Sequence, residues 1–250
     1  MITREPTWLN NNINWGYPPA NKRYYIKDLV FTINCICKLF ISPIWKLRLK
    51  RKLKGCNKKK IALGSGKEVK NGWIGLDYSR SGKNVYPVNL LFPLPFIDNS
   101  IDEILAEHIF EHFHIDDIRT LSSECYRVMK KGGIIRIVSP DANYIAKLIL
   151  EGKNIEKNKD LINDIKIHRW KENDLCWFKF INRLSHQWGE HKSLINKEIV
   201  TLLLNDVGFT EVYYPNSTKE SLLFQEIPDI HSQRFPNESY EMNFVIEAKK

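Results

Sequence analysis

The sequence lacks paired cysteines, a signal-peptide pattern and internal repeats. Its five cysteines are odd in number and scattered, without the paired spacing of a structural zinc site. Cysteine usage of this kind is typical of reduced thiols, so we expect a cytoplasmic protein. The first residues are polar and do not show the basic-then-apolar order of a secretory leader.

A long hydrophobic run is also missing. The densest apolar stretch, Leu29–Trp45, contains Asn34 and Lys38 and is shorter than the roughly 20 apolar residues of a bilayer span. We therefore expect no transmembrane helix. A shorter helix is predicted over Tyr24–Ile41, because this stretch is apolar and Pro43 stops it. Two roles stay open for it, packing against the protein's own core or lying in the plane of an anionic membrane.

Acidic residues are absent from residues 46–60, which carry nine Lys or Arg, so this segment accounts for the formal net charge of +9. Such a block attracts nucleic acid or an anionic membrane surface, or it is a solvated linker. We divide the chain into an N-terminal extension, 1–59, and a domain over 60–250 with an insertion at about 151–195. Peripheral membrane contact is a candidate role for residues 29–60.

From Lys60 onward, short apolar runs alternate with helical patterns. Buried strands are predicted at Lys60–Leu63, Trp73–Leu76, Ile101–Ala106, Ile134–Val138, Glu211–Tyr214 and Met242–Ala248. A helix is predicted over Ile118–Met129, ended by Gly132-Gly133, and a second one over Asn196–Asn205. Strands that alternate with helices favour an α/β domain with a parallel sheet covered on both faces.

Four short signatures follow one another in a fixed order. They are Leu63–Gly66, Asp77, Asn89 before Leu94-Pro95-Phe96, and Tyr126–Gly133 before an apolar run. In this order they resemble class I S-adenosylmethionine-dependent methyltransferases, particularly the type-11-like branch. The resemblance implies a Rossmann-like three-layer sandwich with a mostly parallel seven-stranded sheet and an antiparallel last strand. It also implies S-adenosylmethionine as the cofactor.

The first cofactor contacts that the resemblance implies lie at the carboxyl end of the first strand, where open α/β sheets place ligands. These residues are Leu63, Gly64, Ser65 and Gly66. Glycine at such a turn lets the backbone approach a ligand closely. Two positions depart from the family pattern. Ala62 replaces an acid that helps to hold the cofactor's amino group, and Glu68 stands near the place of the third glycine.

The other implied cofactor contacts are Asp77, Tyr78, Asn89 and Leu90. In the family, a carboxylate at the place of Asp77 accepts the ribose hydroxyls; a simple turn residue is the alternative. Asp77 lies eleven residues after Gly66, against ~20 in a full dinucleotide-binding unit, so the first connection is shortened. Relatives carry Asp where Asn89 stands, and its amide oxygen can still accept from the adenine amino group. The Leu90 amide could donate to the adjacent ring nitrogen.

Three residues are candidates for catalysis. His108 follows a strand and would lie beside the transferred methyl group, as a substrate contact or base. Asp141 follows another strand in Ser139-Pro140-Asp141, and capping the next helix is its alternative role. His191 precedes the helix over Asn196–Asn205, at a place where histidine recurs in the resembling branch.

The sequence His108-Ile109-Phe110-Glu111-His112 matches the inverted zinc-protease signature, which requires a helix. Here it directly follows a predicted strand, so zinc hydrolysis is disfavoured and we predict no metal site. The pattern leaves a distant third ligand open, but its context predicts a different fold. Glu111 and His112 are instead expected to cap or pack within the following helix.

The insertion is rich in aromatic residues and histidine. They are Trp170, Trp177, Phe178, Phe180, His186, Trp188 and His191. Such a cluster suits a lid over a sugar or another small acceptor, or else a satellite core. No Asn-Pro-Pro-Tyr motif of amino-methylating DNA enzymes is present, which disfavours nucleic acid. The sequence thus predicts methyl transfer to a small molecule or a glycan, as in surface polysaccharide or glycolipid synthesis. The alternative is a catalytically degenerate binding or regulatory protein. The oligomeric state is not predicted.

Overall fold

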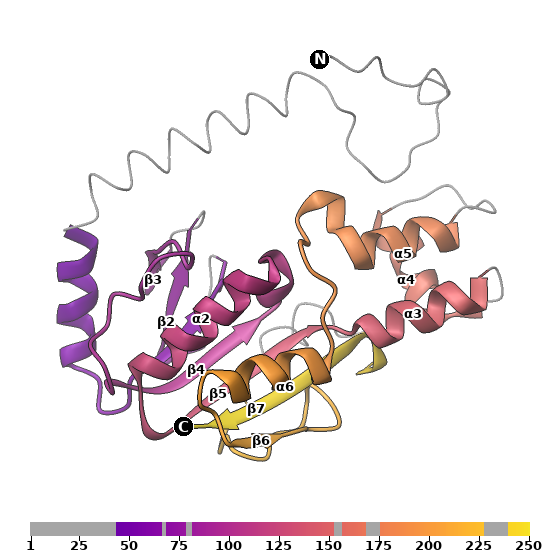
Figure 1. Cartoon of the computed structure of the whole chain (residues 1–250). Coiled ribbons are helices and arrows are strands. Elements are labelled where there is room, and N and C mark those ends of the chain that lie inside the picture. The colour runs from indigo at the N-terminus through magenta and orange to yellow at the C-terminus, as the bar shows by residue number, and fades with distance from the viewer. Residues whose placement is uncertain (1–43, 67–68, 79–81, 153–156, 169–175, 228–239) are drawn as a thin grey trace, which may run out of the picture.

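The computed structural model describes residues 44–66, 69–78, 82–152, 157–168, 176–227 and 240–250 (Figure 1). The helix predicted over Tyr24–Ile41 lies outside these residues. Among the helices of the described part, none combines the length and apolarity that crossing a bilayer requires.

Seven strands form a single sheet in the order β3-β2-β1-β4-β5-β7-β6. Their bounds are β1 Lys60–Leu63, β2 Trp73–Asp77, β3 Val85–Pro87, β4 Ile101–Glu107, β5 Met129–Pro140, β6 Glu211–Tyr213 and β7 Asn243–Lys249. Neighbours from β3 to β5 are parallel, whereas β7 runs antiparallel to both β5 and β6. The structure therefore confirms the Rossmann-like α/β fold with its antiparallel last strand. Only β3 has no counterpart among the predicted strands, because its three residues form no apolar run.

Gly132-Gly133 does not end the helix before it, and this prediction was wrong. Helix α2 (Ile115–Val128) passes directly into β5, and both glycines lie within that strand. The register of β5 against β4 shifts at this point, and Gly132 has a φ of 77°. A Cβ on Gly133 would lie 2.9 Å from the carbonyl oxygen of Lys130. Glycine is thus required by the bent start of the strand rather than by a helix end.

Helices cover one face of the sheet. Figure 1 shows α2 and α6 (Lys197–Asp206) side by side in front of the strands. A further helix, over residues 44–54, buries Leu49 in the same core. Helix α6 begins where predicted, because the Asn196 side chain caps it by accepting from the Ile199 amide. These helices bury the odd-numbered side chains of β1, such as Ile61 and Leu63.

A buried ion pair holds a loop on the other face. Arg136 Nη1 lies 2.5 Å from Glu247 Oε1, and both side chains are fully buried. Arg136 also donates to the carbonyl oxygens of Thr218 and Glu220, at 2.7 and 2.9 Å. Glu247 in turn accepts from the Leu222 amide at 2.8 Å. The two charges therefore fix the segment after β6 against strands β5 and β7, with hydrogen bonds that offset part of their desolvation.

A second, smaller core lies beyond the end of the sheet. Three helices build it: α3 Ala142–Glu151, α4 Lys159–His168 and α5 Cys176–His186 (Figure 1). Phe180 is fully buried there and Trp177 packs against the same cluster. Of the two alternatives for the aromatic insertion, these residues favour the satellite core. Trp170 and the side chain of Trp188 lie outside the described residues.

Candidate active site

The glycine turn after β1 has the backbone that its sequence requires. Gly64 and Gly66 both have positive φ values, 59° and 67°, which side chains rarely tolerate. A Cβ on Gly64 would lie 2.5 Å from Cδ1 of Ile109. The turn after β1 therefore touches the turn after β4, and the two parts of the candidate site are in contact.

Asp77 closes this turn from the neighbouring strand. It is the last residue of β2 and is 9% exposed. Its Oδ2 accepts a hydrogen bond from the Gly66 amide at 2.9 Å. A carboxylate has about four lone-pair positions, so this bond leaves acceptor capacity for hydroxyl groups of a ligand. Asp77 is thus more than a turn residue, and its position suits the predicted ribose contact.

Asn89 and Leu90 follow β3, at the same edge of the sheet. Asn89 Oδ1 accepts from the Leu91 amide at 3.0 Å in a local side-chain turn. The amide oxygen has a second lone pair, so a contact with an adenine amino group is compatible with this turn. Leu90 is buried at 6% exposure. The roles of both residues in cofactor binding stay predictions, as does that of Tyr78.

The loop after Asn89 is held by two side chains of α2 that the sequence reading missed. The Leu94 amide donates to Glu124 Oε2 at 2.7 Å, and Arg127 Nη1 donates to the Phe96 carbonyl at 2.9 Å. Arg127 also pairs with Asp98 at 2.7 Å. The hydrogen bond from Arg127 lowers the pKa of Glu124, against the opposing effect of burial. The stretch with the strongest family resemblance is therefore clamped to α2.

His108 stands directly after β4, in an unusual backbone conformation. Its φ is 50°, and its amide donates to the Val138 carbonyl of β5 at 2.9 Å. A non-glycine residue in this region costs about 1–2 kcal/mol, so its neighbours must hold it there. The side chain is partly exposed, and its Nδ1 lies 3.2 Å from Glu111 Oε1.

Glu111 is the buried centre of this half of the site. It is 2% exposed, and its Oε2 accepts from Ser139 Oγ at 2.6 Å. Burial alone would raise the pKa of Glu111, but hydrogen bonds with His108 and Ser139 outweigh it and lower the pKa to about 2. Glu111 and His112 lie in the 3-10 turn η2 (Phe110–His112), ahead of α2. The prediction that they cap or pack within that helix was wrong.

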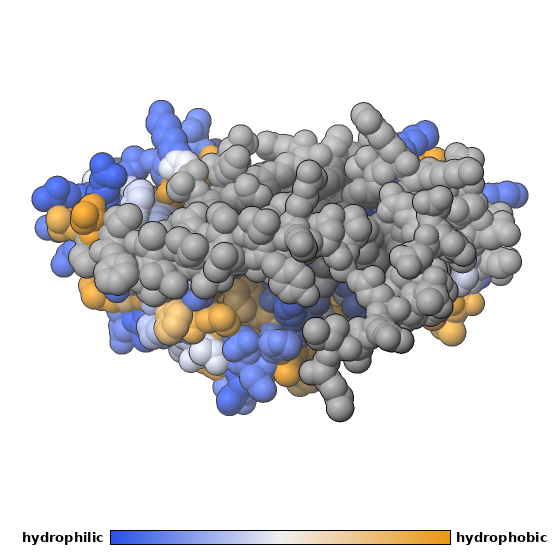
Figure 2. All heavy atoms as spheres, turned by 90° about the horizontal axis from the view of Figure 1, so that it is seen from above, coloured by the Kyte–Doolittle hydropathy of each residue, from blue (hydrophilic) through white to orange (hydrophobic). Residues whose placement is uncertain are grey.

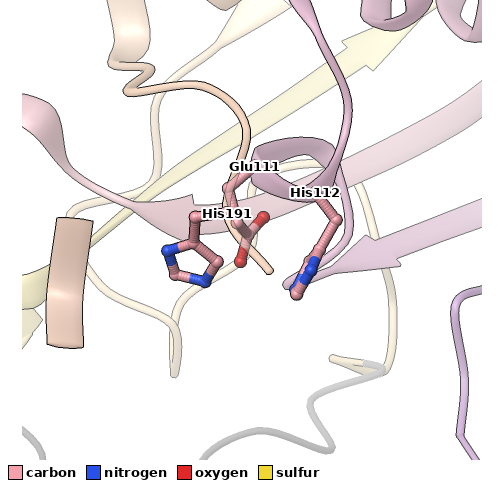
Figure 3. Close-up of side chains that lie close together, drawn as sticks. All are labelled: Glu111, His112 and His191. Atoms are coloured by element: carbon pink, nitrogen blue, oxygen red, sulfur yellow. The ribbon is translucent and has the colours of Figure 1, made fainter. Parts of the chain in front are cut away.

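His191 joins the same cluster from a distant part of the chain. Figure 3 shows the Glu111 carboxylate between the rings of His112 and His191, whose centroids are 5.0 Å apart. His191 Nδ1 lies 2.9 Å from the Leu184 carbonyl oxygen. Burial lowers the pKa of His191, so its neutral form is favoured. The amides of Lys192 and Ser193 donate to the Glu111 carbonyl at 2.8 and 3.2 Å, which fixes the segment beside η2.

Asp141 serves as a helix cap. Its side chain accepts from the Asn143 amide at 2.9 Å at the start of α3, as one of the two alternatives predicted. Burial raises its pKa. The structure thus gathers His108 and His191 around Glu111 and directs the Asp141 carboxylate to the backbone of α3. A catalytic part for any of the three stays a prediction.

Comparison with known proteins supports a methyltransferase. Residues 76–137 match the type 11 family model, which is described as a methyltransferase domain. No curated protein matches the chain.

Two solved structures illustrate the likeness of fold. A SAM-dependent methyltransferase from Archaeoglobus fulgidus is 19% identical, with 85% of this chain and 98% of that chain covered and a TM-score of 0.44. A SAM-dependent methyltransferase from Thermotoga maritima, described as a possible histamine N-methyltransferase, is 18% identical, with 83% and 88% covered and a TM-score of 0.42. The family match over residues 76–137, with which the strand order agrees, supports a class I S-adenosylmethionine-dependent methyltransferase and indicates S-adenosylmethionine as the cofactor.

Proposed function

We propose that the protein methylates an oxygen or nitrogen atom of a small-molecule or glycan acceptor. The contact between the glycine turn and the turn after β4 carries this proposal. Gly64 packs against Ile109, so the predicted cofactor site and the His108–Glu111 pair are neighbours. A methyl donor and a proton acceptor must lie close together, because much of the rate of such a transfer comes from holding the reacting groups in position.

The residues of the chain take separate parts in this reaction. Bound S-adenosylmethionine supplies an electrophilic methyl group on a sulfonium ion. The acceptor's lone pair would take this methyl group, and the electrons of the carbon–sulfur bond would stay on sulfur. We assign to His108 the contact with the acceptor and the uptake of its proton, because it directly follows β4 and its imidazole pairs with Glu111. Asp77 and the glycine turn hold the cofactor.

Calorimetric titration with S-adenosylmethionine tests the cofactor site. The unaltered protein is expected to bind the cofactor saturably below 1 mM. Asp77→Ala should weaken this binding roughly 10–100-fold, which corresponds to the free energy of one or two charge-assisted hydrogen bonds. Asp206→Ala is the matched control, since Asp206 is an exposed carboxylate at the end of α6 that pairs with exposed Arg119. Equal affinity of Asp77→Ala and the control would reject the assigned site. No binding by the unaltered protein would reject the enzyme.

Methyl transfer itself is measured with methyl-labelled cofactor against a panel of sugars, nucleotide sugars, amines and phenols. Once an acceptor is found, His108→Asn is expected to lower kcat by about 10²–10⁴-fold with unchanged cofactor affinity. Cofactor binding without transfer to any member of a broad panel would favour the degenerate alternative, a binding or regulatory protein that keeps the fold.

We also propose a cytoplasmic protein that contacts an anionic membrane surface through its basic helix, which would suit a glycolipid or surface-polysaccharide acceptor. Over residues 44–54, Leu49 is buried in the core, while Ile44 and Leu47 are 59% and 49% exposed among exposed Lys and Arg side chains. The left end of Figure 2, on the side where this helix lies in Figure 1, likewise combines hydrophilic and hydrophobic residues.

Liposome flotation tests the membrane contact. Changing Lys50, Arg51 and Lys54 together to Gln keeps Leu49 in the core, which removal of residues 1–59 would not. At about 1 kcal/mol per charge, the triple variant should partition roughly 100-fold less to vesicles with anionic lipid. Neutral vesicles should bind neither protein. Equal flotation of both proteins on anionic vesicles would reject the contact.

A further inference from the structure

One group of side chains has an arrangement that methyl transfer does not require. Glu111, His112 and His191 each offer a ligand atom, and these atoms all lie within 4.8 Å of one another. Two of the residues come from the turn η2, and the third comes from the segment before α6 (Figure 3). The cluster lies after β4, at the carboxyl edge of the sheet, where α/β proteins bind their ligands.

His191 is prepared as a ligand. Its Nδ1 faces the Leu184 carbonyl oxygen, which can only accept, so the ring proton lies on Nδ1 and the lone pair on Nε2. The residue is 9% exposed, and within the described residues this Nε2 has no hydrogen-bond partner. An unpaired buried polar atom costs about 1–3 kcal/mol. A histidine that donates one nitrogen to a backbone carbonyl and presents the other is the usual form of a metal ligand.

Glu111 provides the negative charge. Its carboxylate is nearly completely buried and meets Ser139 through one oxygen and His108 through the other. Each oxygen keeps a further lone pair after these contacts. A buried carboxylate needs compensating charge. His108 faces one of its oxygens, and a cation bound between Glu111, His112 and His191 would add positive charge to that of His108.

We propose that Glu111, His112 and His191 bind one divalent transition-metal ion of the Zn²⁺ class. Two imidazoles and one carboxylate suit Zn²⁺, whereas Mg²⁺ and Ca²⁺ prefer oxygen ligands. Three protein ligands are also the number that catalytic zinc sites use, with the fourth position left for water or substrate. The inference rests on this cluster alone and does not depend on the proposed methyl transfer.

The ligand set differs from the one that the sequence motif suggests. The H-x-x-E-H signature would use His108 and His112 on one helix, and we rejected it because a strand precedes it. The structure keeps His112 but pairs His108 with Glu111. The third ligand, His191, lies 79 residues after His112 (191 − 112) and is brought in by the amides of Lys192 and Ser193 on Glu111.

Calorimetry with ZnCl₂ on untagged protein stripped by a chelator tests the proposal. One equivalent is expected to bind at micromolar concentration or below, and Co²⁺ should give visible absorption bands of a low-coordinate site. His191→Gln should weaken Zn²⁺ binding roughly 100-fold or more, since changing even a residue that only hydrogen-bonds to a metal ligand costs 10–100-fold. His114→Gln, at an exposed histidine close to η2, is the matched control and should bind Zn²⁺ unchanged.

Two results would overturn the site: no Zn²⁺ binding by the unaltered protein, or equal Zn²⁺ binding by His191→Gln and His114→Gln. Melting temperature and S-adenosylmethionine titration without metal show that the variants are folded. They also separate this test from that of the proposed function, because a protein that binds cofactor but no Zn²⁺ refutes only the metal site. MgCl₂ in place of ZnCl₂ should produce no comparable heat.

Discussion

The two halves of the candidate site are built in different ways. After β1 and β2, the site consists of a glycine turn and one carboxylate, and Gly66 and Asp77 are eleven residues apart. After β4 and β5, it consists of side chains from three separate segments, with His108 and His191 83 residues apart (191 − 108). A local half can retain its pattern across many proteins, because it needs only its own backbone. The half assembled from distant segments can vary with the acceptor.

This contrast makes the halves separable by mutation. A change in the Glu111 cluster should alter stability and metal affinity but leave cofactor affinity intact. Changes in the glycine turn should lower cofactor affinity but leave stability and metal affinity intact. The exception is the place where the two halves touch, at Gly64 and Ile109.

The largest effect is expected for Glu111→Ala. The change leaves Ser139 and His108 without their carboxylate partner in a buried place, which costs about 3–5 kcal/mol of unfolding free energy. Urea denaturation measures the loss. Titration of the folded variant with S-adenosylmethionine should give an affinity within about threefold of the unaltered protein, that is within 0.7 kcal/mol. A large loss of cofactor affinity at full folding would show that the halves are not independent.

A smaller effect is expected where the halves meet. Gly64→Ala adds a side chain at a φ of 59° and forces it against Ile109, which together should cost about 2–3 kcal/mol. The double variant Gly64→Ala/Ile109→Ala removes the contacts with Cδ1 and Cγ1 of Ile109 but keeps the backbone strain and a contact of 3.0 Å with Cβ. Thermal unfolding of the four proteins of this cycle should give a coupling of about 0.5–1.5 kcal/mol in favour of the double variant. A coupling of zero would mean that the two turns do not press on each other.

The smallest effect concerns the clamp on the loop after Asn89. The pKa of Glu124 is lowered in the folded state, so its contribution to stability is present above the unfolded value of about 4.5 and is lost as pH falls through the folded value. Relative to Glu124→Gln, the unaltered protein should therefore lose about 1 kcal/mol of unfolding free energy between pH 6 and pH 3. Parallel urea titrations at the two pH values measure the difference.

At pH 7, Glu124→Gln should also weaken S-adenosylmethionine binding a few-fold, because the clamp positions the loop that follows Asn89, whereas its Zn²⁺ affinity stays unchanged. If the variant and the unaltered protein lose the same unfolding free energy between pH 6 and pH 3, Glu124 does not contribute to the clamp.

The sequence was sufficient for what depends on neighbouring residues. Strand β1 has the predicted bounds, and β2 and β4 each extend one residue beyond the predicted end. Buried strands of a parallel sheet are short, nearly continuous apolar runs, so the sequence marks their bounds closely. The glycine turn and its place beside Asp77 follow from the same local patterns. The helix predicted over Asn196–Asn205 corresponds to α6, which runs one residue later, from Lys197 to Asp206.

The sequence was insufficient where the structure depends on contacts between segments that are distant in the chain. Nothing near His191 indicates that it meets Glu111, since the partners come together only after α3, α4 and α5 have packed. Gly132 resembled a helix end because a strand bend and a helix cap demand the same positive φ. Arg127 lies inside the signature Tyr126–Gly133 and Glu124 just before it, but their contacts with the loop after Asn89 are visible only in the structure.

The ion pair between β5 and β7 also sets the order of events during synthesis. Arg136 leaves the ribosome 111 residues before Glu247, which at about 5–20 residues per second corresponds to roughly 6–22 s. Throughout that interval the guanidinium has no carboxylate partner, so the nascent chain cannot bury it at low cost. Strand β7 must then enter between β5 and β6, next to strands that are already present. The sheet is therefore completed only by its last strand in sequence, and β5 lacks its β7 neighbour until then.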